Sequence, residues 1–398
     1  MQTARKVKTA RLSTFIYFYL NGFIVGVWVI QIPTAVLRTH ITQATLGWLL
    51  LSLGIGALGG MTVLGRYADR LSARATVPAS AFLCALALFF PLRTTNWWEL
   101  GLALVGLGIS AGALDISMNT HAIHVEREYH KPIMSMFHAV FSVGGFSASV
   151  YSAQLAGLGL SSDVIVNIAV GISLIGSIAA AFGVLPKFEE DNHSESSRVK
   201  NSWRNVPRHI WVFAVVAVAV MVSEGIANDW SSIYMQSVRH ASPTLIPYGY
   251  GAFAAMMTVG RGAADRISHR FSSFVVVRYG ASIAFVGIVI VIFAPNSLIA
   301  IIGWATFGAG LSGSVPQVYS AVGHFDRRNA AVNVSRVAGV GYFGMLAGPM
   351  VIGQLTKVVS LQYAFVVPAI LCLLAVYFAR VLRDEGPGDM AEVRPSIA

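Results

Sequence analysis

Three carboxylic acids, Asp115, Glu224 and Asp229, lie inside long apolar stretches of the sequence. An ionised carboxylate in a nonpolar environment costs several kcal/mol unless it has a partner, a water-filled cavity or a proton. An imidazole, His138, lies in the next apolar stretch after Asp115, and a nearby imidazole can tune the proton affinity of a carboxylate. The pattern therefore predicts a site that binds protons or a polar solute inside a nonpolar scaffold.

The spacing of these residues assigns them to helix faces. Asp115 shares a face with Asn119, and Glu224 shares one with Asn228. Asp115 lies about nine residues, or roughly 13 Å, from the end of its predicted helix, and His138 lies about six residues into the next one. We therefore expect Asp115 to bind a proton with His138 as its partner, and Glu224 to contact a proton or the substrate. The alternative for the acid and the imidazole is a structural role in hydrogen bonds between helices.

A second group of residues has the chemistry to bind a polar solute, through amide hydrogen bonds and ring stacking. Asp229 lies about 140° around the helix from Glu224, so it is expected to cap a break near the outer end of that helix, with substrate contact as the alternative. For each Trp the alternative is packing or an interfacial belt. The predicted substrate-binding residues are Asn21, Trp28, Gln31, Asn119, Asn228, Asp229, Trp230 and Gln317.

The elements that position these residues are predicted to be membrane-spanning helices, which makes the fold an all-α membrane protein. The chain is 55% hydrophobic and 12% charged, whereas a soluble domain has roughly a quarter of its residues charged. Apolar runs of about 17 to 27 residues recur, each long enough to cross about 30 Å of hydrocarbon, and they lack the alternation of membrane strands. Twelve spans are predicted, beginning near Ser13, Leu46, Thr76, Glu99, Ile133, Asp163, His209, Ile246, Ser273, Ser297, Asn333 and Leu361.

An internal repeat divides the chain. Residues 69–74 read Asp-Arg-Leu-Ser-Ala-Arg and residues 265–270 read Asp-Arg-Ile-Ser-His-Arg. A repeat of this kind predicts two pseudo-symmetric six-helix bundles with a substrate cavity between them. The predicted units are an N-terminal bundle over residues 1–185, a cytoplasmic linker over 186–208, a C-terminal bundle over 209–383 and a cytoplasmic tail over 384–398.

Glycine-rich strings occur in several spans, and they resemble motifs of soluble enzymes. Gly54-x-Gly56-x-x-Gly59 and Gly339-x-Gly341-x-x-Gly344 fit a dinucleotide fingerprint, which requires a strand before the turn. Small residues that let helices approach closely explain them better, and they predict contact between the second and eleventh spans. No enzyme, cofactor or metal site is predicted, although an intramembrane enzyme remains the alternative from a different functional class.

The basic residues predict the orientation of the chain. Lys and Arg gather in the tails, the linker and every second loop, and the loop between the eighth and ninth spans is assigned Arg261, Arg266 and Arg270. This asymmetry places both termini in the cytoplasm. Contact with anionic headgroups accounts for the net charge of +10, so no nucleic-acid partner is expected.

The repeated loop also carries a family signature. The pattern Gly-x-x-x-Asp-Arg-x-Gly-Arg-Arg/Lys is matched by Gly65, Asp69, Arg70 and Arg74, while Ser72 and Ala73 depart from it. The chain thus resembles the major facilitator superfamily. Asp115-x-x-x-Asn119, Met136-Phe137-His138-x-x-Phe141-Ser142-x-Gly144-Gly145 and Glu224-Gly225-x-x-Asn228-Asp229-Trp230 are similar to the fucose-permease-type branch and its uncharacterised bacterial inner-membrane subgroup. The resemblance implies a conformational latch made of Gly65, Asp69, Arg70, Arg74, Asp265 and Arg266.

Together these patterns predict a monomeric secondary transporter in the inner membrane, whose partners are protons, a small solute and the lipid bilayer. We expect alternating access, proton coupling and a polar, sugar-like substrate. The alternative is a proton-driven exporter of amphipathic, drug-like compounds, which would have an apolar cavity wall.

Overall fold

The computed structural model describes residues 2–67, 72–130, 133–185, 206–326 and 329–383. These residues form helices and turns and contain no strand, which confirms the predicted all-α fold. The long helices of the first half are α1 (Gln2–Thr39), α2 (Gln43–Tyr67), α3 (Ala73–Ala87), α4 (Trp97–Tyr129), α5 (Met134–Gly157) and α6 (Ser162–Ala181). Those of the second half are α7 (Arg208–Ser237), α8 (Ile246–Phe271), α9 (Ser273–Phe293), α10 (Ser297–Leu311), α11 (Ser314–Phe325), α12 (Ala330–Leu355), α13 (Leu361–Ala364) and α14 (Val366–Phe378).

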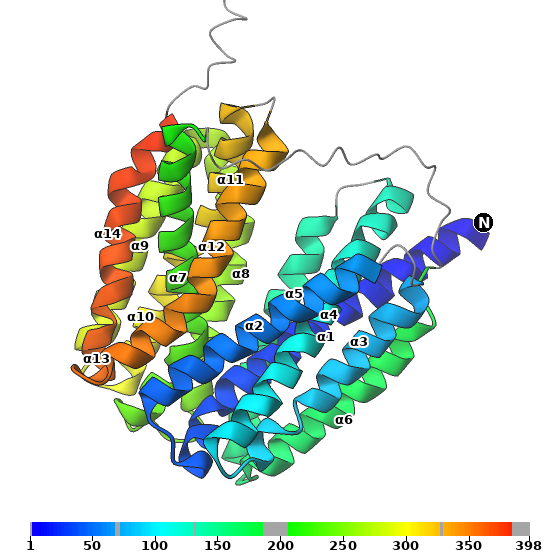
Figure 1. The fold of residues 1–398 in the computed structure, drawn as a ribbon, viewed down its shortest axis with the longest axis horizontal. Coiled ribbons are helices and arrows are strands. Elements are labelled where there is room, and N and C mark those ends of the chain that lie inside the picture. The colour runs from blue at the N-terminus through cyan, green and yellow to red at the C-terminus, as the bar shows by residue number, and fades with distance from the viewer. Residues whose placement is uncertain (1, 68–71, 131–132, 186–205, 327–328, 384–398) are drawn as a thin grey trace, which may run out of the picture.

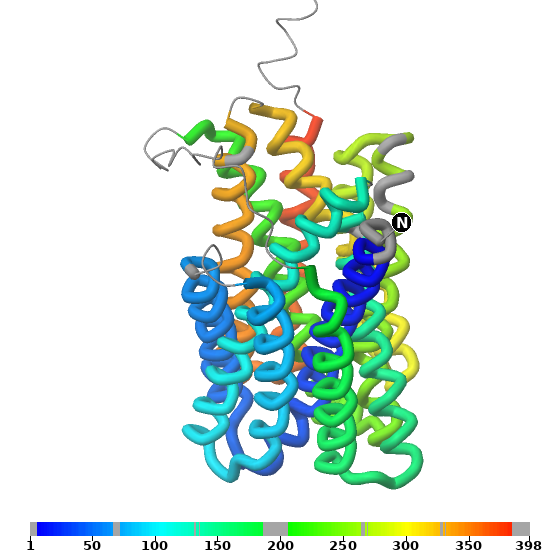
Figure 2. The backbone as a smooth tube through the Cα atoms, turned by 90° about the vertical axis from the view of Figure 1, so that its right-hand side faces the viewer, coloured from blue at the N-terminus to red at the C-terminus, as the bar shows by residue number. Residues whose placement is uncertain are grey.

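The helices form two bundles, α1–α6 and α7–α14 (Figure 1). The start of α1, the end of α6, the start of α7 and the end of α14 all lie toward one end of the molecule, which we call the linker end (Figure 1). The bundles approach each other at the opposite, far end and their helices diverge toward the linker end (Figure 1). Viewed from the side, the helices of both bundles run along one common direction (Figure 2). This arrangement is what a multi-pass membrane protein requires.

The predicted spans correspond to these helices, with two spans divided into two pieces. The tenth span is broken at Ser312 and Gly313, between α10 and α11, and Pro316 lacks the N–H that a continuous helix would use there. The twelfth consists of α13 and α14. In the described part of the chain, ten helical stretches are long and apolar enough to cross a membrane. The helices α5 and α8 are not among them, and they pack against each other across the two bundles.

The duplication is visible in the packing of the first helix of each half. A Cβ added at Gly22 of α1 would lie 1.9 Å from the carbonyl oxygen of Phe141 in α5. A Cβ added at Gly225 of α7 would lie 2.7 Å from the carbonyl oxygen of Met345 in α12. In both halves the first span therefore needs a glycine to approach the fifth span of the same half, which is α5 in the first half and α12 in the second.

The far end repeats a second arrangement. The guanidinium of Arg38, at the end of α1, donates to the carbonyl of Leu92 and forms an ion pair with Asp163 at the start of α6. The guanidinium of Arg239, just after α7, donates to the carbonyl of Ala294 and to Gln362 at the start of α13. Each half thus uses one arginine to join its first, third and sixth spans, and the two bundles are pseudo-symmetric copies.

The two bundles contact each other mainly through α5 with α8, α2 with α12 and α1 with α7. The predicted contact between the second and eleventh spans is confirmed, because a Cβ at Gly47 would lie 3.0 Å from Met350. Most of the glycine strings serve a different purpose. Gly56 faces α4 and Gly341 faces α7, so these residues tighten the packing inside each bundle.

Candidate functional site

A cavity of about 230 Å³ lies between the two bundles. Its wall is formed by α1, α2, α3, α4 and α5 of the first half and by α7, α8 and α12 of the second. Its polar lining residues are Ser142, Glu224, Asn228, Asp229, Tyr250 and Arg261, with Trp28 from α1. The remaining wall is mostly apolar and includes Ile24, Val25, Val29, Leu50, Leu53, Phe141, Phe253, Met257 and Leu346.

An ion pair crosses the cavity wall between α7 and α8. The guanidinium of Arg261 lies 3.1 Å from a carboxylate oxygen of Glu224. The same guanidinium donates to the hydroxyl of Ser142 in α5, at 3.3 Å. Arg261 therefore neutralises an acid of its own bundle and at the same time holds a polar group of the other bundle.

The structure corrects the sequence prediction for Arg261. We had expected it in a loop between the eighth and ninth spans, but α8 continues to Phe271 and Arg261 lies inside it. The signal was present in the sequence, because a span of about 20 residues that begins near Ile246 already includes this position. Tyr250 and Ser142 are two further lining residues that the sequence analysis did not nominate.

Asp229 lines the same cavity as Glu224, although the sequence analysis favours a capping role for it. We had expected Asp229 to cap a break near the outer end of its helix, but α7 runs unbroken from Arg208 to Ser237. The prediction of a cap is therefore wrong. Although Asp229 and Glu224 are about 140° apart on the helix, both reach the cavity, because Asn228 lies between their directions and the cavity covers a wide sector of α7.

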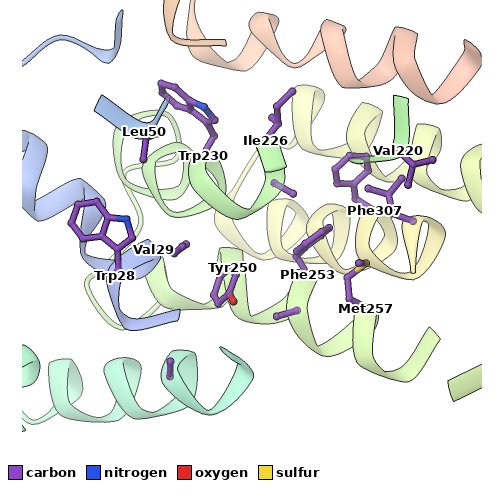
Figure 3. Packing of buried hydrophobic residues seen from close by; sticks show 14 of the residues in the cluster. Trp28, Val29, Leu50, Val220, Ile226, Trp230, Tyr250, Phe253, Met257 and Phe307 are labelled. Atoms are coloured by element: carbon purple, nitrogen blue, oxygen red, sulfur yellow. The ribbon is translucent and has the colours of Figure 1, made fainter. Parts of the chain in front are cut away.

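Aromatic residues define the apolar part of the site. Trp28 of α1 and Tyr250 and Phe253 of α8 lie among the buried residues near the contact between the bundles (Figure 3). Trp28 is 4% exposed, and its indole N–H has no hydrogen-bond partner among the described residues. The indole N–H groups of Trp230 and Trp304 are buried in the same way, so Trp28 contributes mainly an apolar ring to the wall.

Asp115 lies outside the residues that line the cavity. Its carboxylate accepts a hydrogen bond of 3.2 Å from the amide of Asn119, which also donates to the backbone carbonyl of Asp115 at 2.9 Å. Tyr342 of α12 lies within electrostatic range of both Asp115 and Glu224. The two acids therefore lie near the same tyrosine, although only Glu224 lines the cavity.

His138 is the predicted partner of Asp115, and the structure places it near a different charge. Its ring packs edge-on against Phe18 with 5.2 Å between ring centres, and it lies within electrostatic range of Arg261. Its backbone carbonyl accepts a hydrogen bond from the hydroxyl of Ser142, the residue that Arg261 contacts. Among the described residues, Asn119 is the hydrogen-bond partner of Asp115, not His138.

Five predicted substrate residues lie elsewhere, and one of them is Asn119, which bonds to Asp115. The amide of Asn21 is buried and donates to the sulfur of Met118 at 3.9 Å, and Trp230 is fully buried. Gln31 lies in a separate cavity of about 260 Å³ that also includes residues of α6 and the start of α8. The side-chain amide oxygen of Gln317 accepts hydrogen bonds from the hydroxyls of Ser268 and Ser273, where α8 meets α9. The cavity therefore brings together Trp28, Glu224, Asn228 and Asp229 from the predicted set.

The predicted latch falls largely outside the described part of the structure. Asp69 and Arg70 are not among the described residues, nor are the side chains of Asp265 and Arg266. Gly65 lies in α2 with open space beside it. The guanidinium of Arg74 donates to the carbonyl of Val184, so it joins the start of α3 to the end of the sixth span.

The remaining ionisable clusters have structural partners. His121 is buried and lies within hydrogen-bond distance of Thr14 and of the backbone N–H of Leu185. A carboxylate oxygen of Glu126 accepts from the backbone N–H groups of Ile133 and Met134, which caps the start of α5. No group of three His, Cys, Asp or Glu residues that could hold a metal ion occurs within the described ranges.

Comparisons of the sequence and of the fold with known proteins both find membrane transporters. A model of the Major Facilitator Superfamily matches residues 12–335. An uncharacterized MFS-type transporter of Yersinia pestis is 31% identical over 374 residues, which cover 94% of this chain and 95% of that protein. The fold is also similar to solved transporter structures. The nucleoside transporter NupG has a TM-score of 0.76 at 15% identity, covering 94% of this chain and 99% of that one. FucP in the outward conformation has a TM-score of 0.61 at 17% identity, covering 93% and 98%.

Proposed function

The chain belongs to the major facilitator superfamily, and we propose that it is a secondary transporter that moves a small polar solute by alternating access. Its family and its relatives are transporters, and its apolar helices make it a multi-pass membrane protein. The substrate, the proton coupling and the direction of transport are the parts that we propose here.

One observation carries the proposal: the polar groups of the cavity come from both bundles and are joined by Arg261. The guanidinium contacts Glu224 in its own bundle and Ser142 in the other. We propose that a solute enters from the linker end, toward which the helices of the two bundles diverge (Figure 1). Rocking of one bundle against the other then exposes the same site at the far end.

We propose that protons are carried by Asp115 and Glu224. A carboxylate at membrane depth is stable when it is protonated or paired, and both acids lie within electrostatic range of Tyr342 in α12. Protonation of Glu224 would free Arg261 from its ion pair, so the state of the acid changes the contact to Ser142. His138 lies close enough to Arg261 to respond to the same change.

The remaining expectations become proposals that depend on orientation. We place the linker end, with both termini, in the cytoplasm of a cell whose inner membrane holds the protein, and we propose that it acts as a monomer. At the linker end, Asp69 and Asp265 with their neighbouring arginines would form a latch between the halves. In this assignment, Asp69→Ala slows transport and leaves substrate affinity nearly unchanged.

The proposal is tested with the purified full chain. A thermal-shift screen against a few hundred metabolites identifies solutes that stabilise it, and the best of these is then offered to proteoliposomes with an imposed pH gradient. We expect the gradient to drive accumulation, and an uncoupler that collapses the gradient to stop it. Glu99→Gln, which changes an acid at the start of α4 away from the cavity, serves as a control with normal transport. Solute binding without any transmembrane movement would refute the proposal.

A second candidate function rests on the apolar part of the wall. Leu50, Leu53, Phe253 and Met257 would suit an amphipathic compound better than a sugar. Export of such compounds predicts broad inhibition of transport by unrelated lipophilic molecules. A single polar solute class predicts selective inhibition by close analogues only.

A further inference from the structure

One carboxylate in the central cavity has no counter-ion. The charged residues that line the cavity are Glu224, Asp229 and Arg261, and Arg261 is paired with Glu224. No side chain in the described ranges donates a hydrogen bond to Asp229 or forms an ion pair with it. When Asp229 is ionised, the cavity therefore contains one negative charge that has no counter-ion.

The surroundings of Asp229 make this charge a strong attractor for cations. Most of the wall is apolar, and an apolar wall weakens the dielectric screening that bulk water provides. The rings of Tyr250 and Phe253 line the same cavity, and aromatic faces stabilise an ammonium group through cation–π contact. A neutral solute would leave the charge of Asp229 without compensation, and an anion would be repelled by it.

We infer that the transported solute carries a protonated amine that pairs with Asp229. The cavity of about 230 Å³ is below the roughly 300–1,000 Å³ of drug-sized pockets, so the solute is small. A small amine fits these requirements. This inference rests on the proposed transport function and names the chemical class of its substrate.

The first test compares matched solutes that differ only in the amine. Purified full chain is heated with D-glucosamine or D-glucose, and with benzylamine or benzyl alcohol, and the melting temperature is recorded. The amine of each pair is expected to stabilise the protein more than its hydroxyl counterpart. Asp229→Asn removes this preference, whereas Glu99→Gln retains it. Equal stabilisation by both members of each pair, or an amine preference that survives in Asp229→Asn, overturns the inference.

The second test measures the charge of the cavity without any substrate. Val25→Cys introduces a thiol at the cavity wall in a background where Cys84→Ala and Cys372→Ala remove the native thiols. A cationic methanethiosulfonate is expected to react about tenfold faster than an anionic one, after correction for their rates with free thiol. Asp229→Asn should abolish this difference and Glu99→Gln should not. Equal rates for the two reagents in the parent would show that Asp229 holds a proton instead, and would refute the inference.

The two tests also separate this inference from the proposed function. If amines bind through Asp229 but no solute crosses the membrane, the transport proposal fails and the assignment of the amine site stands. If neutral solutes are transported normally by Asp229→Asn, transport stands and the amine inference fails. If no solute of the panel stabilises the protein, the ratio of the two reaction rates decides.

Discussion

The two bundles share their backbone packing and differ in their charges. In each half the first span approaches the fifth span through a glycine, which is Gly22 in the first half and Gly225 in the second. The residue before that glycine is Asn21 in the first half and Glu224 in the second. Among the described residues, buried Asn21 bonds through its side chain only to a methionine sulfur, whereas Glu224 lines the cavity and pairs with Arg261. Equivalent positions therefore have different chemistry.

This difference shows what a duplicated scaffold constrains. A position where two backbones touch tolerates no Cβ, so both copies retain glycine there. The neighbouring position points elsewhere and is free to change. In this protein the second half supplies Glu224, Asn228, Asp229 and Arg261, while the first half supplies Ser142, Trp28 and a mostly apolar wall. The acid of the first half, Asp115, is held by Asn119 of its own helix instead.

The largest effect is expected at Asp115, the acid that stands apart from the cavity lining. Asp115→Asn removes a proton-binding carboxylate and keeps the shape of the side chain, so accumulation driven by a pH gradient should be abolished. Counterflow exchange of solute, which needs no net proton movement, should continue. Both are measured in proteoliposomes with the same radiolabelled solute. If accumulation persists in Asp115→Asn and is lost in Glu224→Gln, coupling resides in the second half alone.

The next largest effect concerns the ion pair of the second half. Glu224→Gln leaves Arg261 without its acid, and an unpaired charge in a partly buried site costs about 1–3 kcal/mol of stability, so the melting temperature should fall and transport should be reduced. Initial transport rates measure this reduction. The double variant Glu224→Gln with Arg261→Gln removes both charges, so its melting temperature should recover while transport stays low. A double variant no more stable than the single one would argue against the pair.

The shared scaffold is tested by adding a single methyl group at three glycines. Gly22→Ala places a Cβ 1.9 Å from a carbonyl oxygen and Gly225→Ala places one 2.7 Å from the equivalent atom. Overpacking of this kind typically costs about 1–3 kcal/mol, and the closer approach should cost more. Gly59 has open space beside it, so Gly59→Ala is the matched control. Melting temperatures should fall in the order Gly59→Ala, Gly225→Ala, Gly22→Ala, and equal values would show that the helices adjust freely.

Much of the fold could be predicted from the sequence, because the length of an apolar run and its lack of alternation determine a membrane helix. The faces of α7 were also readable, since helical periodicity relates Glu224 to Asn228. Arg261 was misplaced because a basic residue near a predicted span end was assigned to a loop, although the span itself was long enough to include it. The rule that counts basic loop residues cannot distinguish an arginine that faces a cavity.

Other residues were misplaced because helical periodicity predicts the face of a helix on which a residue lies, but not its depth along the helix or a bend in that helix. Gln31 lies on α1 three residues beyond Trp28, close enough to the far end to reach a different cavity. Gln317 follows the break at Ser312 and Gly313, which turns α11 toward the junction of α8 and α9. No pattern in the sequence indicated that break except Pro316, which lies just beyond it. Contacts between distant helices are the information that a single sequence lacks.

The smallest effect is expected at the far end, where the two halves again differ by one charge. Arg38 pairs with a carboxylate, Asp163, whereas Arg239 contacts an amide, Gln362. Gln362→Glu should copy the arrangement of the first half and stabilise the second by about 0.2–1 kcal/mol, the usual range for a partly exposed ion pair. The melting temperature should rise slightly, and high salt should remove the gain because it screens exposed charges. Since the same arginine geometry exists in both halves, a gain that persists in high salt would mean that the new side chain acts by packing, and that charge is not what distinguishes the two far-end clusters.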